Sequence, residues 1–481
     1  MAGGPVDHPE AGDAVRSDRH VATRSRGQGA LAVIVLAAVI GGGFALQRGL
    51  GQRLPEVAAS GTARSGAWFC PHGGGTKEWK ATLYLSNPGV DPVTARITSL
   101  VGRKPSTTQG VTVPPETTVG VTVPAIGREA STYVEYFGGW VAAGWVAQGG
   151  GGEIGVGAEP CAPSAARTWY APDGTTEQGQ DAYLIVMNPF AVDAVFNVVL
   201  LTPKRAPIRN AKLTDRVLQP GRSVAFRLNA YAEGDPAVGA EVDVSLGRVA
   251  VSSLGISRDG GIRSVIGSTG ATLQVDLPAG ATAGQSTLAV MVPGDAPLRF
   301  GATLISGEAP VPAGGLTESD QNPTSADAYP ITISGASSTD VLAQGSTAFA
   351  ATQRSIGVGN DDAATGGAAS AASGWVVLPA IAGEPARPGL VLVDPGNASV
   401  TVTLHALVPQ GQTRPPDVTV TIAAGSVVQA PSAFLALVDR AAIEVRSEGG
   451  DVIAMAASTS LGVKGLSTYA MAMGVAVPAR S

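Results

Sequence analysis

Acidic side chains in two segments are the only residues of this sequence that suggest a metal site. Asp173, Glu177 and Asp181 fall within one turn, and Asp361 precedes Asp362 in a stretch of small residues. Hard cations such as Ca²⁺ take several oxygen ligands from a flexible loop, so both places are calcium candidates. Neither has the EF-hand spacing, and solvated turn acids are the favoured interpretation. We therefore predict no bound metal and no cofactor.

An aromatic residue between cations marks a candidate ligand-binding loop. Lys77, Trp79 and Lys80 follow a glycine-rich turn, where we expect them to be exposed. An exposed indole can stack on a sugar ring, which makes this loop a candidate glycan site. The alternative interpretation is a hairpin with ordinary surface residues.

The chain has too few histidines to suggest a histidine-based catalytic site. Beyond the first 26 residues only His72 and His405 occur, and they lie in different repeats. We assign His72 to a glycine-rich turn and His405 to the solvent-facing side of a strand. The chain has no G-x-S-x-G, P-loop or C-x-x-C motif. The sequence therefore favours a protein that is not an enzyme.

Two cysteines, Cys70 and Cys161, make up the whole cysteine content. Both follow the apolar N-terminal segment and lie in the first repeat, so we predict one disulfide formed in an oxidising compartment. In the chain-entropy model, closing so long a loop is worth about 4 kcal/mol. Two unlinked buried thiols are the alternative.

A unit of roughly 100 residues occurs four times. A proline ends a β-like apolar run at intervals of 101, 104 and 102 residues: Pro88, Pro189, Pro293 and Pro395. The same 19-position interval separates Trp68 from Asn87, Trp169 from Asn188, and Trp375 from Asp394. In the third copy, Leu273 stands where a tryptophan is expected. We expect the opening tryptophans to fill the space between two sheets.

Strict alternation of apolar and polar residues, clearest over 399–406, predicts half-buried strands. The fold class is therefore all-β: tandem antiparallel β-sandwich repeats, immunoglobulin-like in architecture, after one N-terminal transmembrane helix. The expected segments are a cytoplasmic tail (1–26), the helix (27–47), a linker (48–66) and sandwiches at 67–166, 167–270, 271–373 and 374–481. The third, degenerate unit is expected to carry a mobile acidic insertion at 307–329 and an exposed linker at 357–374.

The seventeen uncharged residues 30–46 are long enough to span most of a bilayer core. Four arginines precede them and two follow, which favours a cytoplasmic N-terminus and an extracellular C-terminal bulk in the cell membrane. A cleaved signal peptide, with small residues at 57–59, is the alternative. The chain carries 32 basic and 38 acidic residues, a net charge of −6. We saw no basic stripe, so nucleic acid is not an expected partner.

The openings WFCP and WYAP, the strands that end in Asn-Pro and the single N-terminal apolar helix resemble an actinobacterial family called domain of unknown function 5719. The resemblance covers most of the chain from Trp68 onward, and the third and fourth units depart from its motifs. It implies a single-pass membrane, β-rich envelope protein, often encoded near glycosyltransferases. It provides no established activity and no catalytic residues to carry over.

We therefore expect a non-enzymatic, membrane-anchored extracytoplasmic protein that binds or scaffolds a cell-envelope glycan or an envelope protein assembly. One alternative is an envelope polysaccharide hydrolase, which needs a cleft with two carboxylates about 5 to 10 Å apart. A second alternative is a passive structural spacer, whose domains would lie end to end.

Overall fold

In the computed structural model of the chain, each repeat folds as two antiparallel sheets packed face to face. The structure describes residues 65–478 apart from 101, 103–105, 204, 281, 295–296, 307–309, 317–326, 336–338, 358–360, 382–385, 439 and 462–466. Helical structure among the described residues is limited to η1 (Ala211–Leu213), η2 (Leu228–Ala230) and α2 (Ser432–Leu435). The predicted all-β fold is confirmed.

The transmembrane helix predicted at 27–47 lies outside the described residues. Within the described part of the chain, no helix combines the length and apolar character needed to cross a membrane.

Sandwich 1 sets the strand order that the other repeats follow. Its strands are β1 (Ser65–Cys70), β2 (Lys80–Asn87), β3 (Val93–Leu100), β4 (Thr107–Val113), β5 (Thr117–Val123), β6 (Ser131–Phe137), β7 (Ala142–Gln148) and β8 (Val156–Pro160). The two sheets have the orders β1-β6-β3-β4 and β5-β2-β7-β8. In an immunoglobulin domain the first strand lies beside the second, whereas here β1 pairs with β6. The sandwich architecture is immunoglobulin-like, but the strand order is different.

Sandwich 2 repeats this order with a shorter fourth strand. Its strands are β9 (Thr168–Ala171), β10 (Gln180–Asn188), β11 (Ala194–Leu201), β12 (Arg216–Leu218), β13 (Arg222–Arg227), β14 (Gly239–Leu246), β15 (Ala250–Ser257) and β16 (Ile262–Ile266). The sheets have the orders β12-β11-β14-β9 and β13-β10-β15-β16. Strand β12 pairs with only three residues of β11. The loop that precedes β12 therefore lies along much of that edge of the sheet.

Sandwich 3 joins its two sheets through one long strand. Its strands are β17 (Thr272–Pro278), β18 (Thr282–Val292), β19 (Phe300–Ile305), β20 (Val311–Leu316), β21 (Asp327–Ser334), β22 (Asp340–Gly357) and β23 (Asp362–Gly366). The first part of β22 pairs with β17 and β19, and its last part pairs with β18 and β23. Strands β20 and β21 occupy part of the stretch 307–329, so the insertion expected there is partly regular sheet.

Sandwich 4 completes the series with two short additional strands. It contains β24 (Gly374–Val377), β25 (Ala386–Arg387), β26 (Leu390–Asp394), β27 (Val400–Leu407), β28 (Val418–Ile422), β29 (Ser426–Gln429), β30 (Ala442–Glu448), β31 (Ile453–Leu461), β32 (Ser467–Met473) and β33 (Val475–Ala476). One sheet has the order β28-β27-β30-β24-β33, and the other β25-β31-β26-β29 with β32 paired to β31.

The opening tryptophans lie between the sheets, as predicted. Trp68, Trp169 and Trp375 are at most 5% exposed. Each indole Nε1 donates to the backbone carbonyl just before the seventh strand of its sandwich: to Val141 at 2.7 Å, Val249 at 2.8 Å and Val452 at 2.7 Å. This bond satisfies the one polar atom of a large buried ring, which explains why tryptophan suits the position.

The alignment of Leu273 with these tryptophans is wrong. Leu273 is 58% exposed, whereas Val275 is 6% exposed and belongs to the core of sandwich 3. The backbone of Asp276 pairs with Ala368 after the eighth strand, just as Phe69 pairs with Ala162. Val275 therefore occupies the tryptophan position, and the smaller side chain removed the signal on which the sequence comparison relied.

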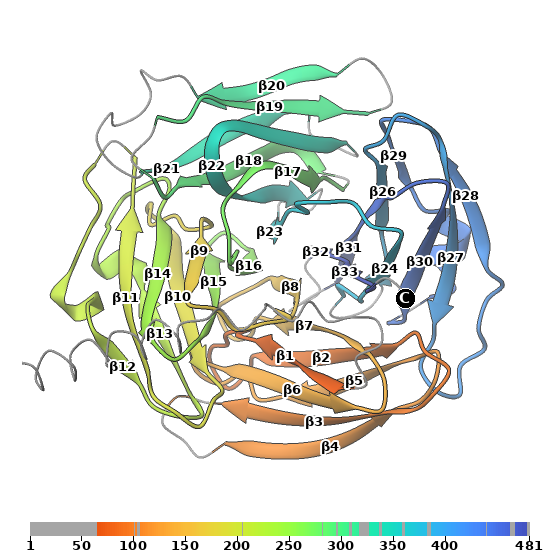
Figure 1. The fold of residues 1–481 in the computed structure, drawn as a ribbon, viewed down its shortest axis with the longest axis horizontal. Helices are drawn as coiled ribbons and strands as arrows, with labels where there is room; N and C mark the ends of the chain where they lie inside the picture. Colours follow the sequence, from red (N-terminus) through yellow and green to blue (C-terminus); the bar gives the residue numbers. More distant parts are fainter. Residues whose placement is uncertain are drawn as a thin grey trace, which may run out of the picture. The chain divides into compact units, whose positions relative to one another are not determined.

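The eighth strands of the sandwiches meet in the middle of the fold (Figure 1). Each of β8, β16, β23 and β32 packs against the eighth strands of two neighbouring sandwiches. Ala363, Ala364 and Thr365 of β23 are at most 3% exposed. The exposed linker expected at 357–374 is therefore wrong, because its small side chains form a buried strand that lets four backbones approach closely.

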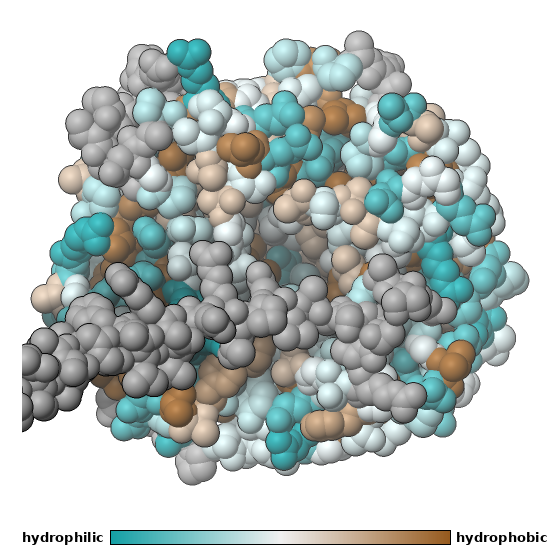
Figure 2. All heavy atoms as spheres, viewed as in Figure 1, coloured by the Kyte–Doolittle hydropathy of each residue, from teal (hydrophilic) through white to brown (hydrophobic). Residues whose placement is uncertain are grey.

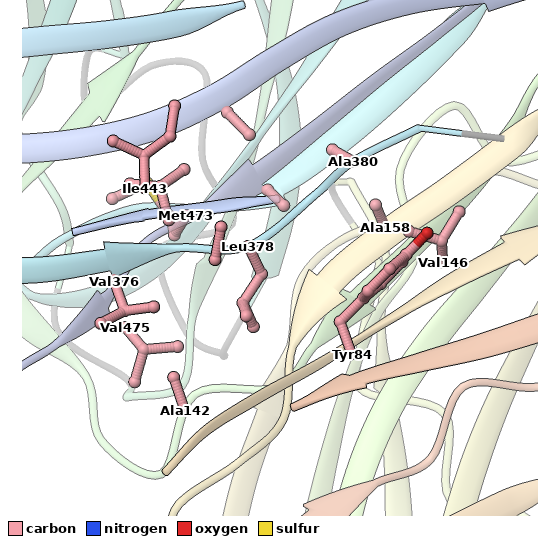
Figure 3. Packing of buried hydrophobic residues seen from close by; sticks show 14 of the residues in the cluster. Tyr84, Ala142, Val146, Ala158, Val376, Leu378, Ala380, Ile443, Met473 and Val475 are labelled. Atoms are coloured by element: carbon pink, nitrogen blue, oxygen red, sulfur yellow. The ribbon is translucent and has the colours of Figure 1, made fainter. Parts of the chain in front are cut away.

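Sandwiches 1 and 4 close the arrangement through a buried apolar contact. Residues from both belong to one hydrophobic cluster, and Figure 3 shows Tyr84 and Ala158 of sandwich 1 in the same region as Leu378 of sandwich 4. A Cβ at Gly144 would lie 2.6 Å from Leu378 Cδ1, so glycine permits this contact. Arg414 also pairs with Glu116 at 2.7 Å.

Together these contacts make residues Ala59–Ser481 one compact unit. The end-to-end arrangement that a passive spacer would need is not found among the described residues.

Candidate functional site

Trp79 is buried, so the loop predicted to stack on a sugar does not present its ring. The side chain is 4% exposed, and Nε1 donates to Glu153 Oε2 at 2.7 Å. The Arg128 guanidinium lies 5.4 Å from the centre of the ring and also pairs with Glu153. Lys77 and Lys80 are exposed on either side. The prediction failed because an arginine 49 positions away, which no local pattern reveals, covers the indole.

Asp173 is a buried ion-pair partner and does not face solvent as a metal ligand would. Its Oδ1 accepts a 2.9 Å hydrogen bond from Arg354, and Oδ2 lies 3.5 Å from the buried Arg263. Burial alone would raise the pKa of Asp173, but the two guanidinium groups outweigh burial and lower it. Arg263 also pairs with Asp362, so these charges join sandwiches 2 and 3.

The remaining calcium candidates also have other partners. Asp181 pairs with Arg227 at 2.7 Å, and Glu177 accepts a long 3.5 Å bond from the Thr175 hydroxyl. Asp361 accepts a 2.8 Å hydrogen bond from the Tyr469 backbone N–H. Within the described residues, no three acidic, histidine or cysteine side chains form a group that could hold a metal ion.

The two histidines are far apart and engaged separately. His72 is fully buried, where its ring contacts the Gly73 carbonyl and the Thr132 hydroxyl, and burial lowers its pKa to about 4. His405 Nδ1 lies 2.7 Å from Asp417 Oδ1. The Thr132 hydroxyl beside His72 is itself fully buried, so neither contact places a histidine beside an accessible nucleophile.

The predicted disulfide between Cys70 and Cys161 is present, with a Cα–Cα distance of 4.6 Å. It connects the end of β1 to the residue that follows β8. The bond therefore ties the first and last strands of sandwich 1 together.

A groove of about 550 Å³ between two edge strands of sandwich 2 is the best candidate for a ligand site. Strand β12 lies at the edge of one sheet and β13 at the edge of the other. The side chains that define the groove are Phe196, Arg216, Val217, Leu218, Arg222 and Phe226. We call it the aromatic–arginine groove.

The floor of the groove is part of the sandwich core, and its rims carry arginines and an exposed valine. The rings of Phe196 and Phe226 meet edge to face, 6.1 Å apart. Val217 on the rim is 60% exposed. Ser223 donates to the Glu129 carbonyl of sandwich 1, and Gly102 of sandwich 1 completes the wall. The apolar floor and cationic rims are therefore held by the fold and by the neighbouring sandwich.

The other repeats serve as internal controls for this groove. At the first position of the fifth strand, sandwich 2 has Arg222 where sandwiches 1 and 4 have Thr117 and Ser426. At the third position of the third strand, Phe196 replaces Ala95 and Val402. Two positions before the end of the fourth strand, Arg216 replaces Val111 and Val420. The repeated fold does not require these residues, so we attribute them to a property of sandwich 2 alone.

A local charge signal could have identified this surface from the sequence. Residues 202–222 contain six basic residues and one acidic residue, in a chain whose net charge is −6. The expectation that the chain has no basic stripe is therefore wrong for residues 202–222. On the face seen in Figure 2, hydrophobic atoms of the described residues occur in scattered patches instead of one broad area.

This combination of groups suits an anionic ligand with an apolar face. Guanidinium groups bind carboxylates and phosphates through paired hydrogen bonds, and the exposed Val217 side chain offers an apolar contact beside them. Phe196 is fully buried and Phe226 is 7% exposed, so their rings support the groove and do not stack on a ligand. None of the residues that line the groove is a carboxylate. The groove therefore suits an anionic ligand, and its lining lacks the acids that a glycosidase uses.

Carboxyls with strongly raised pKa values lie inside the fold and away from this groove. Burial raises the pKa of Glu159 to about 8 and that of Asp361 to about 7. Burial and the neighbouring Asp276 carboxyl raise the pKa of Asp340 well above its ordinary value. Asp276 and Asp340 are at most 5% exposed, so neither carboxyl can reach a glycosidic bond.

The comparisons with known proteins give a family similarity and little else. The model of a family of unknown function, DUF5719, matches residues 135–328, which is less than half of the chain. The match begins in sandwich 1, includes all of sandwich 2 and ends in sandwich 3. It supports the resemblance noted from the sequence. None of the curated proteins matches the chain.

Among solved structures, the chain has a weak similarity to the crystal structure of a tetra-tandem repeat in the extending region of a large adhesion protein. The identity is 11%, the TM-score is 0.10, and the match covers 86% of this chain and 100% of that chain. A TM-score this low carries no argument about fold or function.

Proposed function

We propose that this protein is a non-enzymatic scaffold of the cell envelope that holds an acidic glycan in the aromatic–arginine groove of sandwich 2. The observation that carries the proposal is the divergence of one repeat. Phe196, Arg216 and Arg222 stand where sandwiches 1 and 4 have small or aliphatic residues, and they line a groove.

Packing between the sandwiches supports a scaffold role. Buried charges join sandwiches 2 and 3, and an apolar contact joins sandwiches 1 and 4. Such contacts hold the groove in a fixed position relative to the neighbouring sandwiches, which reduces the entropy lost on binding. Anchoring through residues 27–47 and an extracytoplasmic location belong to the same proposal.

The hydrolase alternative has less support. The groove has no lining carboxylate, and the acids with strongly raised pKa values are buried. Retaining and inverting glycosidases need two acids that flank an accessible bond. A binding role requires only the residues that line the groove.

Calorimetric titration of the full chain tests the proposal. The probes are an oligogalacturonate and a neutral galacto-oligosaccharide of the same length. We expect the uronate to bind at least tenfold more tightly, because guanidinium groups recognise carboxylates. Arg216→Gln and Arg222→Gln should each weaken binding about tenfold, since each removes a charge-assisted contact.

Arg248→Gln is the matched control, because Arg248 is an exposed arginine of sandwich 2 that does not line the groove. Equal binding of the acidic and neutral sugars would refute the proposal, as would equal loss in all three variants. Binding of a DNA oligomer as tight as that of the uronate would indicate a general polyanion surface and would also refute it.

A further inference from the structure

A second cleft, of about 530 Å³, lies at one end of sandwich 2 beside the turn between β9 and β10. Its charged and amide lining includes Glu177, Gln180, Asp181, Arg227, Glu233 and Arg258. We call it the polar pocket. Its lining differs from that of the aromatic–arginine groove, and the inference below is independent of the glycan proposal.

The same place in sandwich 1 is filled by protein side chains. Trp79 precedes Asn87 by eight positions, as Gln180 precedes Asn188, so Trp79 and Gln180 are equivalent. In sandwich 1 the indole lies against the ion pair of Arg128 and Glu153. An aromatic ring with a cation and an anion beside it therefore occupies this space.

Sandwich 2 has the same framework with a smaller residue at the tryptophan position. The Gln180 amide is turned toward the protein, where Nε2 donates to Ser257 at 3.2 Å and Oε1 accepts from Arg263 at 3.4 Å. An amide in this orientation does not fill the volume of an indole. Gln180 therefore leaves part of this space open, although Thr176, the counterpart of Gly75, adds a side chain where a Cβ at Gly75 would lie 2.3 Å from the Trp79 Nε1.

Two of the opposite charges that line this pocket, Glu233 and Arg258, form no ion pair with each other among the described residues. The segment between the fifth and sixth strands contributes Arg128 in sandwich 1 and Glu233 in sandwich 2. The turn between the seventh and eighth strands contributes Glu153 in sandwich 1 and Arg258 in sandwich 2. Glu233 and Arg258 are exposed, and neither makes an ion pair within the described part of the chain.

The walls of the pocket are fixed by other bonds. Asn229 Nδ2 donates to the Gln180 carbonyl at 2.8 Å, and its Oδ1 accepts from the Ala182 N–H at 3.0 Å. The ion pair of Arg227 and Asp181 forms a further wall. Free charges on a fixed frame are suited to recognition, because little ordering is required when a ligand binds.

We propose that the polar pocket binds a small zwitterion, an amino acid or a peptide end that carries a free ammonium and a carboxylate. The carboxylates of Glu233 and Glu177 receive the ammonium, and the Arg258 guanidinium receives the carboxylate. A volume of about 530 Å³ is within the usual range for small-molecule sites.

Titration of the full chain with three related probes tests this proposal. The probes are free L-tryptophan, L-tryptophan amide, which lacks the carboxylate, and N-acetyl-L-tryptophan, which lacks the ammonium. We expect the free amino acid to bind at least tenfold more tightly than either derivative. Arg258→Gln should abolish the preference over the amide, and Glu233→Gln should abolish the preference over the N-acetyl form.

Gln180→Trp supplies a test that does not depend on charge. It introduces a large ring at a position that lines the pocket and should abolish binding, while Arg248→Gln should leave binding unchanged. Thermal unfolding of each variant verifies that the protein is folded. Failure of all three probes to bind at millimolar concentration would overturn the inference, and so would equal binding of the three probes. Unchanged binding by a folded Gln180→Trp variant would also overturn it.

Discussion

Thr365 Oγ1 donates a 2.9 Å hydrogen bond to Glu159 Oε2 in the middle of the fold. Glu159 is the fourth residue of β8 and Thr365 is the fourth residue of β23, so equivalent positions of sandwiches 1 and 3 meet directly. The Gly366 N–H donates to the other carboxyl oxygen at 3.3 Å. Neither side chain is more than 2% exposed. A carboxyl group without a nearby cation therefore links two repeats that are not adjacent in the sequence.

Glu159→Gln should change how the stability of the protein depends on pH. Burial raises the pKa of Glu159 from 4.5 to about 8, so the folded state retains a proton that the unfolded state has lost. This contribution is fully present below pH 4.5 and disappears as pH rises to about 8. The wild-type free energy of unfolding should therefore fall by up to about 1.4 kcal/mol per pH unit relative to Glu159→Gln. Urea unfolding at several pH values measures this difference, and a difference that does not vary with pH would contradict the prediction.

Asp394→Asn should stabilise sandwich 4. Asn87 and Asn188 each accept from a backbone N–H and donate from Nδ2 to nearby carbonyls, whereas Asp394 Oδ2 is buried without a partner. Restoring the amide should raise the free energy of unfolding by about 1–3 kcal/mol. The gain should be larger at pH 7 than below pH 3.8, because burial raises the pKa of Asp394 above that ordinary value and the buried charge of the wild type is absent in acid. Asn188→Asp is the reverse control and should destabilise the protein, as measured by urea unfolding.

Trp79→Ala should affect stability and leave glycan binding unchanged. The substitution removes a ring that is 4% exposed and a hydrogen bond to Glu153, and it should cost about 3–5 kcal/mol. Lys77→Ala, on the exposed side of the same loop, should change the free energy of unfolding by less than about 0.5 kcal/mol. Equal effects of the two substitutions would show that the ring is not held as described.

The double variant Cys70→Ala/Cys161→Ala should unfold more readily than the wild type. The two cysteines are 91 residues apart, and the chain-entropy model assigns about 4 kcal/mol to a loop of that length. Chemical unfolding with and without a reductant measures the loss in the wild type. The double variant should be insensitive to the reductant, and a reductant-sensitive variant would point to another cause.

Much of the architecture could be predicted from the sequence because it depends on local periodicity. Alternating residues identified strands such as β27 and β28, and Asn-Pro marked where second strands end. The tryptophan positions in three repeats predicted core residues correctly. The third repeat was misaligned at Leu273, because a valine fills the equivalent site and carries no distinctive signal.

The candidate sites were harder to predict because they depend on contacts between distant residues. Trp79 resembled an exposed platform until Arg128 and Glu153 were placed against it. Asp173 resembled a turn acid, but two arginines from later segments enclose it. The basic segment 202–222 was visible in the sequence, although its groove was not.

The sequence alone determined that this protein is a series of β-sandwiches with one cysteine pair, since strand periodicity, turn residues and repeat intervals are local properties. Only the tertiary structure decided that the four eighth strands meet in the middle and that sandwich 1 contacts sandwich 4. These contacts join residues hundreds of positions apart. They depend on how small and charged side chains fit together when whole sheets pack, and no local pattern encodes that fit.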